Sequence, residues 1–400
     1  MKNVVVLDNG ACTLKICRSG ETVVRTVPNS IFRSKTERRK SFVSSRIDSC
    51  KDFSSLFYVL PFQKGYLLNW DVQRQIWDFI FGKDVLNLKF NETSVIVTEP
   101  HFNFASIQES MNEIFFEEYE FNSIIRINAS TLASHQYSHD NPEENCCLVV
   151  DSGYSFTHIV PYYKNRKIVE AVCRIDVGGK LITNHLKEVI SYRQLQVMDE
   201  TYVMNQVKED ACYISMSFNE EMATCKKKGK ENTVLRDYVL PDYTQIKRGY
   251  IKPVEESKKP NPKSKTQEQT IRLTVERFTV PEILFHPSDV GISQMGLAEG
   301  ILHSISKCPE KYRPHLLRNI LLIGGNCLFP NFKERLEHDV RELAPDEQEI
   351  FIILPPDPTT YACQGGMTWS NSDGIKKHWL SQRDYQEGGQ VTCAKYFPDI

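Results

Sequence analysis

The chain has 400 residues, of which 40% are hydrophobic and 25% are charged, and its formal net charge at pH 7 is −2. These fractions are typical of a soluble globular protein with room for two or three domains. The nearly neutral charge gives the chain as a whole no electrostatic basis for binding nucleic acid. No apolar run approaches the roughly 18 residues of a membrane-spanning helix, and a predicted strand already begins at residue 4. We therefore expect no membrane partner and no signal peptide.

Twelve cysteines are scattered along the chain. None forms a C-x-x-C pair, and the adjacent residues Cys146 and Cys147 have poor geometry for sharing a metal ion. We expect buried free thiols in a reducing compartment.

The first predicted element is a buried strand at residues 4–8 that runs into the Asp-Asn-Gly turn at 8–10. A return strand at 13–17 completes a predicted hairpin. Lys15 lies on this return strand, where its ammonium can reach a phosphate held at the turn. The alternative at this point is a solvated strand lysine.

The following segments alternate between strands and helices. Strand-like sequence at 57–68 precedes a helix that opens at 69–71, and a strand at 95–99 is stopped by a proline. The next helix has a clear apolar stripe, and Ser106 and Glu109 form its predicted capping box. This order predicts an α/β domain.

At residue 147 the pattern restarts with a second hairpin. Its first strand runs into the Asp-Ser-Gly turn at 151–153, and a β-rich run leaves that turn. A glycine pair at 178–179 then precedes a helix, which permits close approach of a ligand or of another backbone. Turn N–H groups bind anions and carboxylates hold cations through water, so a phosphate chain with its metal ion can lie between the two turns.

A third turn of this kind comes later in the chain. A helix is predicted over 200–214, and a strand over 319–323 ends in the Gly-Gly-Asn turn at 324–326. Asn331 and Glu334 are predicted to cap the helix that follows.

Two segments have no periodic pattern. Residues 33–40 form a basic run, for which a mobile surface loop is the default and a nucleic-acid contact the alternative. Residues 226–270 contain a lysine run at 226–230 and a stretch at 255–270 that is rich in lysine, proline and glutamate. We expect a disordered insertion there, with a DNA or histone contact as the alternative.

The three turns resemble, in order and spacing, those of the ATP-binding superfamily that holds actin, the large heat-shock chaperones and the sugar kinases. The resemblance implies an α/β actin-like fold with two duplicated ribonuclease-H-like domains around a central nucleotide cleft. The first domain would span 1–146, with a basic loop in the 33–55 region, and would be joined by the C-terminal 340–400. The second would span 147–339 and include the insertion at about 226–270.

In that superfamily two aspartate-bearing hairpins grip the phosphates and the metal ion, and the glycine turn supports the adenosine. The resemblance therefore implies ATP or ADP with Mg²⁺ as a structural ligand, with Asp8 and Asp151 reaching the metal indirectly. The residues implied to bind the nucleotide are Asp8, Asn9, Gly10, Lys15, Asp151, Ser152, Gly153, Lys208, Glu209, Gly324, Gly325 and Asn326.

The similarity to actin itself covers nearly the whole chain. The segments that resemble actin are 69–71, 98–100, 151–153, 157–161, 208–209, 285–288 and 381–389. Within the family the sequence is most similar to the sixth subfamily of nuclear actin-related proteins, through segments 61–66, 104–113, 184–188, 191–195 and 198–200.

That resemblance implies a non-catalytic subunit of a nuclear chromatin-remodelling complex that exchanges a nucleosomal histone for its variant, with effects on transcription and heterochromatin. The implied partners are a helicase-like motor ATPase and small accessory subunits, with the nucleosome and the histone variant met indirectly. The implied location is the nucleus, with some protein in the cytoplasm.

The sequence departs from actin at the phosphate turns. Ala11 and Cys12 replace a Ser-Gly pair, and the lost hydroxyl donor is worth on the order of 1 kcal/mol or more. Tyr154 and Ser155 replace an Asp-Gly pair, so a carboxylate gives way to an aromatic ring.

Two further departures concern hydrolysis and the adenine. Asn128 aligns with the glutamine that orients the attacking water in actin, and a displacement of about 1 Å can cost on the order of a hundredfold in rate. Thr359 aligns with an adenine-facing lysine. We expect a cleft without catalytic residues that holds a nucleotide as a structural wedge; the alternative is an empty cleft held by protein contacts.

Two other functions remain open from the sequence alone. A weak ATPase with nucleotide-dependent clamp closure would use the retained aspartates, and a cytoskeletal actin-like protein would use filament contacts. Residues 36–55 replace actin's filament loop with a basic, serine-rich sequence. We therefore expect no filament.

Overall fold

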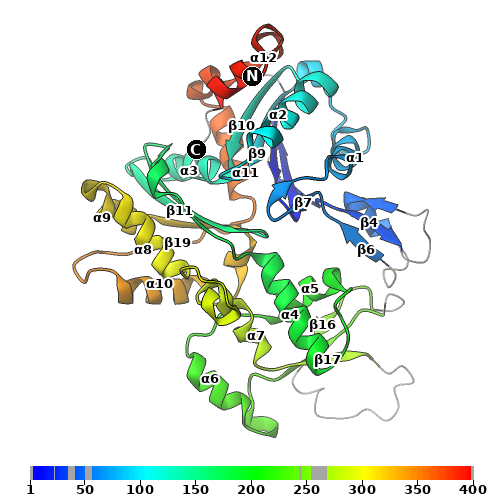
Figure 1. Cartoon of the computed structure of the whole chain (residues 1–400), viewed down its shortest axis with the longest axis vertical. Coiled ribbons are helices and arrows are strands. Elements are labelled where there is room, and N and C mark those ends of the chain that lie inside the picture. Colours follow the sequence, from blue (N-terminus) through cyan, green and yellow to red (C-terminus); the bar gives the residue numbers. More distant parts are fainter. Residues whose placement is uncertain are drawn as a thin grey trace.

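The computed structural model describes residues 3–21, 23–34, 41–49, 56–242, 246–253 and 268–397. Two six-stranded sheets form its centre (Figure 1). The first sheet, in the order β20-β10-β9-β1-β2-β3, consists of β1 (Val4–Asn9), β2 (Thr13–Arg18), β3 (Arg25–Pro28), β9 (Ser94–Glu99), β10 (Ser123–Asn128) and β20 (Leu380–Ser381). The second, in the order β13-β12-β11-β18-β19 with β14 paired to β12, consists of β11 (Cys146–Ser152), β12 (Thr157–Tyr163), β13 (Arg166–Lys167), β14 (Cys173–Ile175), β18 (Ile320–Ile323) and β19 (Ile352–Ile353).

Both sheets contain the same unit, a hairpin beside a parallel strand. β1 and β2 pair antiparallel, and β9 runs parallel to β1. β11 and β12 pair antiparallel, and β18 runs parallel to β11. The two predicted hairpins and the mixed α/β class are therefore confirmed.

Strand β11 contributes to two hydrophobic cores, because successive side chains of a strand point to opposite faces. Cys147 and Val149 pack in the core that includes Val6, whereas Leu148 and Val150 pack in the core around the second sheet. The hairpin that carries Asp151 is thus fixed from both sides.

Helices surround the sheets, and among those that the structure describes none has the length and apolar character needed to cross a membrane. The helices are α1 (Trp70–Phe81), α2 (Ala105–Glu113), α3 (Ala129–Asp140), α4 (Gly179–Arg193), α5 (Thr201–Ala211), α6 (Phe218–Cys225), α7 (Glu276–Thr279), α8 (Leu297–Lys307), α9 (Arg313–Leu317), α10 (Phe332–Leu343), α11 (Tyr361–Ser370) and α12 (Gln382–Tyr396). The eleven cysteines in the described segments are free, as predicted.

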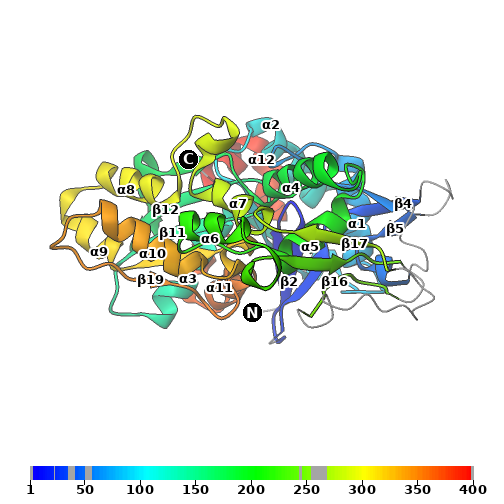
Figure 2. The ribbon, with the colours of Figure 1, turned by 90° about the horizontal axis from the view of Figure 1, so that it is seen from below.

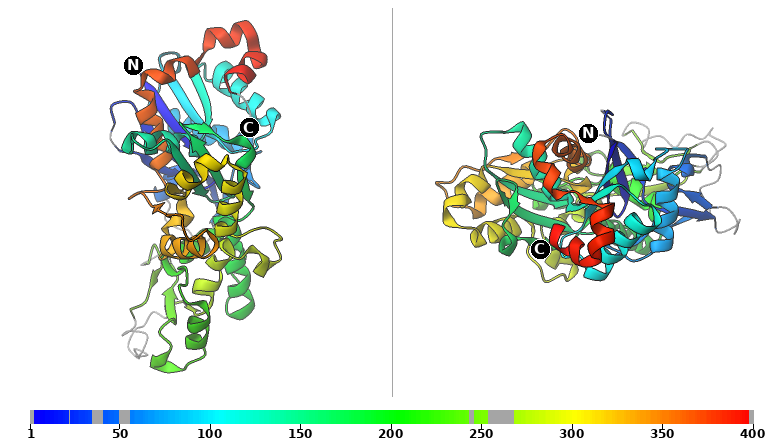
Figure 3. Two further views of the ribbon diagram at one scale, coloured as in Figure 1. Left: turned by 90° about the vertical axis from the view of Figure 1, so that its left-hand side faces the viewer. Right: turned by 90° about the horizontal axis from the view of Figure 1, so that it is seen from above.

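The C-terminal part of the chain returns to the first sheet. β20 pairs with β10, and α11 and α12 lie beside the strands of that sheet (Figure 3, left). Two glycines let α11 approach closely. A Cβ at Gly365 would lie 2.0 Å from the carbonyl oxygen of Leu132 on α3, and one at Gly366 would lie 2.6 Å from Cγ1 of Val6.

Two predicted helix caps are wrong. Helix α2 begins at Ala105 after Phe104, without a side-chain cap from Ser106. Asn331 precedes α10 in a left-handed conformation (φ 67°), and its Nδ2 donates to the carbonyl oxygen of Ile214 rather than capping the helix. At Asn331 a tertiary contact overrides the local signal.

The predicted disordered insertion is partly ordered, which corrects the sequence analysis. Its buried residues Tyr238 and Val239 lie on β15. Lysines on either side make the overall composition of 226–270 polar, although the run around Tyr238 is apolar. The sheet to which they belong, in the order β16-β15-β17, consists of β15 (Arg236–Val239), β16 (Tyr250–Ile251) and β17 (Thr270–Leu273). Residues 243–245 and 254–267 lie outside the described segments.

A second small sheet lies in the basic-loop region. It has the order β5-β4-β6 and consists of β4 (Ile31–Ser34), β5 (Ser41–Val43) and β6 (Leu56–Val59). The short hairpin of β7 (Phe62–Gln63) and β8 (Tyr66–Leu67) follows it. β4 and β5 lie on the same side of the molecule as α5, β16 and β17 (Figures 1 and 2). Residues 35–40 and 50–55 are outside the described segments, so the predicted mobility of the basic run stays a prediction.

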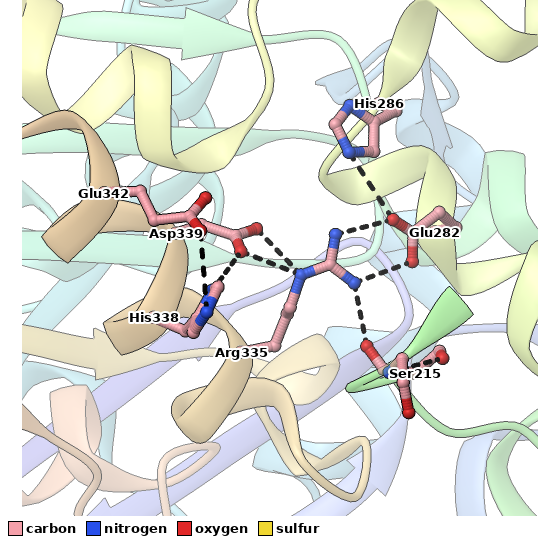
Figure 4. A network of polar contacts seen from close by, with 8 residues as sticks. Ser215, Glu282, His286, Arg335, His338, Asp339 and Glu342 are labelled. Carbon is pink, nitrogen blue, oxygen red and sulfur yellow. Dashed lines mark hydrogen bonds and ion pairs between the residues drawn. The ribbon is translucent and has the colours of Figure 1, made fainter. Parts of the chain in front are cut away.

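A buried ion-pair network fixes α10 (Figure 4). Arg335 Nη2 donates to Glu282 Oε1 at 2.8 Å, its Nη1 donates to the carbonyl oxygen of Ser215 at 2.8 Å, and its Nε lies 2.9 Å from both carboxylate oxygens of Asp339. Burial raises the pKa of Glu282, and Arg335 opposes this rise. Removing one member of such a network leaves a buried charge without its partner.

We expect Gly365→Ala to lower the free energy of unfolding by about 1–3 kcal/mol, because the added methyl group overlaps a backbone carbonyl that cannot move aside easily. Thermal melting checks this. Gly374→Ala is the matched control, since its new Cβ would have Ser372 Oγ as its nearest neighbour at 3.8 Å. Equal melting temperatures for the two variants would contradict the packing account.

Candidate functional site

A cavity of about 490 Å³ lies between the tips of the two hairpins. Its volume is within the range of roughly 300–1,000 Å³ that ligand pockets occupy. Eleven of the twelve predicted nucleotide-binding residues line it, and Ser152 is the exception. They are Asp8, Asn9, Gly10, Lys15, Asp151, Gly153, Lys208, Glu209, Gly324, Gly325 and Asn326.

The first hairpin tip presents a buried carboxylate. Asp8 Oδ1 accepts a hydrogen bond from Thr98 Oγ1 at 2.8 Å, and the same hydroxyl accepts from the backbone N–H of Asn9 at 2.8 Å. Lys15 pairs with Asp8 across the β1–β2 ladder, and its Nζ lies 3.3 Å from Asp8 Oδ2. The solvated-lysine alternative is therefore wrong, because Lys15 lines the cavity.

The charges at the two tips influence one another. Burial favours the neutral amine of Lys15, but the carboxylates of Asp8 and Asp151 outweigh burial, so the pKa of Lys15 is raised. Burial and then the negative charge of Asp8 raise the pKa of Asp151 to about 7, and Lys15 opposes this rise. Two carboxylates with one ammonium between them leave room for one more positive charge, which a proton or a bound cation can supply.

The third turn is bonded to the second hairpin. Asn326 Nδ2 donates to Ser152 Oγ at 3.1 Å and to the carbonyl oxygen of Gly153 at 2.8 Å. The Ser152 hydroxyl is fully buried and also hydrogen-bonds Thr157 Oγ1 at 2.9 Å. Gly324 is required here, since its φ is +96° and a Cβ would lie 2.3 Å from the carbonyl oxygen of Ser152. Ser152 thus positions the turns instead of facing the cavity.

The glycine pair at 178–179 serves a backbone approach. The N–H of Gly179 donates to the carbonyl oxygen of Gly153 at 3.0 Å, and the N–H of Lys180 donates to that of Tyr154 at 2.8 Å. A Cβ at Gly178 would lie 2.6 Å from the carbonyl carbon of Ser155. The N-terminus of α4 is therefore used to hold the second hairpin tip.

Helix α5 supplies the other end of the cavity. Lys208 is buried in the last turn of the helix, and burial lowers its pKa. Its Nζ donates to Asn205 Oδ1 at 2.8 Å and to the carbonyl oxygen of Gly179 at 3.3 Å. Asn205 Nδ2 in turn donates to Glu209 Oε1 at 2.7 Å. The helix ends at Ala211, three residues before the predicted end.

Several residues that line the cavity have buried polar atoms without a partner among the described residues. These are both amide atoms of Asn9, Nδ1 of His101 and Nε2 of His158. An unsatisfied buried polar group costs about 1–3 kcal/mol. Burial, followed by the charge of Arg174, lowers the pKa of His158 to about 3, so its imidazole is neutral. These atoms favour a polar ligand.

The two histidines were not predicted as site residues. His158 lies opposite Asp151 in the β11–β12 register. The ring centroids of His101 and His158 are 5.0 Å apart. The hairpin pattern could have placed His158 beside Asp151. Nothing in the local sequence placed His101 there, because it follows β9, a strand of the other sheet.

Asn128, the residue aligned with a water-orienting glutamine, is not among the residues that line the cavity, although its neighbours Glu99 and Ala129 are. Its Oδ1 accepts a hydrogen bond from Lys167 Nζ, and its Nδ2 donates to the carbonyl oxygen of Glu99 at 3.1 Å. Both ends of the amide are therefore engaged.

The residues present fit a nucleotide with Mg²⁺, because carboxylates, a buried ammonium and unsatisfied donors meet in one cavity. Asp8 and Asp151 would hold the cation, and Lys15 with the turn N–H groups would face the phosphates. When bound, the cation would supply positive charge between the two carboxylates.

Another group of possible metal ligands lies on α10, far from these turns in the sequence. His338, Asp339 and Glu342 have ligand atoms within 4.8 Å of one another. Asp339 is already held by Arg335, as Figure 4 shows. His338 and Glu342 are exposed.

The raised pKa of Asp151 predicts a pH-dependent effect of Asp151→Asn. The wild-type carboxyl ionises at about pH 4 in the unfolded chain and at about 7 in the fold. The folded state thus loses stability as pH rises from 4 to 7, and the loss is complete above 7. We expect the melting temperature of Asp151→Asn to exceed that of wild type by an amount that grows over this interval and then levels off.

Melting at pH 5 and pH 8 without nucleotide or divalent cation measures this. Asp346→Asn, on an exposed residue, is the control. If the melting temperatures of Asp151→Asn and wild type differ by the same amount at pH 5 and at pH 8, the raised pKa of Asp151 is contradicted.

Comparisons with known proteins agree with this geometry. The Actin family pattern matches residues 1–398. The chain is 44% identical to actin-related protein 6 of Drosophila melanogaster over 96% of its own length and 97% of the relative's. It is 34% identical to actin-related protein 6 of Arabidopsis thaliana over 99% and 100% of the two chains, and 33% identical to that of Dictyostelium discoideum over 98% and 94%. The chain belongs to the actin family and has the actin-like fold that its turns predicted.

Proposed function

We propose that the chain is a non-catalytic subunit of a nuclear chromatin-remodelling complex that exchanges a nucleosomal histone for its variant. In this role it is a rigid body that docks a helicase-like motor ATPase and small accessory subunits, and it meets the nucleosome indirectly. Support comes from its similarity over nearly full length to proteins named actin-related protein 6. The proposed location is the nucleus, with some protein in the cytoplasm.

The observation that carries the non-catalytic part of the proposal is the state of Asn128. Each end of its amide bonds to one protein group, so Lys167 and the carbonyl of Glu99 fix its orientation and not an attacking water molecule. His158 is a weak base because its pKa is lowered to about 3. Hydrolysis depends on placing and activating an attacking water, and neither residue is suited to that task.

A weak ATPase is the second candidate. It is favoured by the retained pair Asp8 and Asp151 and by the unsatisfied Asn9 amide, which together suit a magnesium nucleotide. A structural nucleotide uses the same residues without turnover, because a ligand stabilises the state that binds it by mass action alone.

Affinity purification of the tagged full chain from nuclear extract tests the proposal. We expect recovery of a remodelling motor and a histone variant, and we expect Asp151→Asn to recover the same partners, because docking does not require chemistry in the cavity. Recovery of cytoskeletal proteins in place of a motor would overturn the nuclear assignment. Loss of the motor in Asp151→Asn, with the variant folded, would contradict a role independent of chemistry.

A further inference from the structure

Two tyrosines from distant parts of the chain meet beside the cavity, which Tyr154 lines. Tyr58 lies on β6 of the small β5-β4-β6 sheet, and Tyr154 follows the tip of the second hairpin. Their hydroxyl oxygens are 3.0 Å apart, which is a hydrogen bond between residues 96 positions apart in the chain. Burial raises the pKa of Tyr58 to about 12 and raises that of Tyr154 as well, so both phenols are neutral at physiological pH.

A second contact reinforces the first. The ring of Phe32 on β4 meets the ring of Tyr202 on α5 edge to face, with centroids 5.4 Å apart. Phe32 and Ile47 are buried in this cluster, and Tyr58 packs against it. Because α5 also carries Lys208 into the cavity, the small sheet is attached to a wall of the cavity itself.

Tyr154 lines the cavity, with its ring next to Gly179. The position of a Cβ on Gly179 would be 3.4 Å from Tyr154 Cδ2, 3.3 Å from Lys208 Nζ and 3.2 Å from Asn326 Oδ1. The ring therefore shares the space next to Gly179 with two of the predicted nucleotide-binding side chains. This space lies between the second hairpin tip and helix α5.

We propose that Tyr58 and Tyr154 form a latch that keeps the Tyr154 ring in the cavity, so that a nucleoside di- or triphosphate binds fully only after the ring has moved out. The inference goes beyond the proposed function, since it concerns the ligand equilibrium of the isolated chain. When the competent state is a fraction of the population, the apparent Kd is weakened by that same fraction. A latch closed in nine molecules of ten thus weakens binding about tenfold.

The test measures binding of fluorescently labelled ADP with Mg²⁺ to the purified full chain, with unlabelled ATP as competitor. We expect Tyr154→Ala to tighten the apparent Kd about tenfold or more, because the ring is gone. Tyr58→Phe and Tyr154→Phe keep the rings and lose the hydrogen bond, and each should tighten it about threefold to fivefold. Adding Tyr58→Phe to Tyr154→Ala should change nothing further, since the bond has already been removed.

Tyr192→Ala is the control, because Tyr192 is 93% exposed. If the Tyr154→Ala and Tyr58→Phe variants fold but bind ADP no more tightly than wild type, the proposal is overturned. If Tyr154→Ala does not fold, the two Phe variants decide: tighter binding supports the latch, and unchanged or weaker binding overturns it. Partner recovery from nuclear extract is a separate readout, so failure of the latch and failure of the proposed function are distinguishable.

Discussion

The structure depends on the burial of two carboxylates and one ammonium between two hairpins. Asp8 and Asp151 end strands of different sheets, and Lys15 lies 3.3 Å from the first of them. Like charges in a buried space repel strongly. The pair is therefore more stable with a bound proton, in keeping with the raised pKa of Asp151, or with a bound cation. This electrostatic need explains why a chain with altered phosphate turns still has a cavity suited to a magnesium nucleotide.

Side chains from the two parts of the protein meet beside the cavity. Besides the hydroxyl contact of Tyr58 with Tyr154, Arg174 lies 3.6 Å from the ring centroid of Phe156 and donates to the hydroxyl of Tyr66 at 2.5 Å. These contacts join the β6–β8 segment to the second sheet. Such contacts need no turnover to hold the two parts together, which agrees with the proposed role as a docking subunit.

Much of the fold could be predicted from local patterns, whereas the chemistry of the site could not. Apolar runs ending in Asp-x-Gly turns predicted both hairpins, because a strand leaves a clear local pattern. The role of Lys15 stayed open because register decides it. The cap at Asn331 failed because Ile214, far away in sequence, takes its amide. The engagement of Asn128 and the pairing of Tyr58 with Tyr154 are also tertiary contacts, which no local pattern reveals.

We propose that this actin-family cavity is kept for structure and not for hydrolysis. The most direct measurement is a single-turnover assay, in which ATP labelled at its terminal phosphate is mixed with an excess of the purified chain and Mg²⁺. The account predicts that the label stays in ATP, with no release of phosphate above the buffer rate. Release above that rate, abolished by Asp151→Asn, would contradict it.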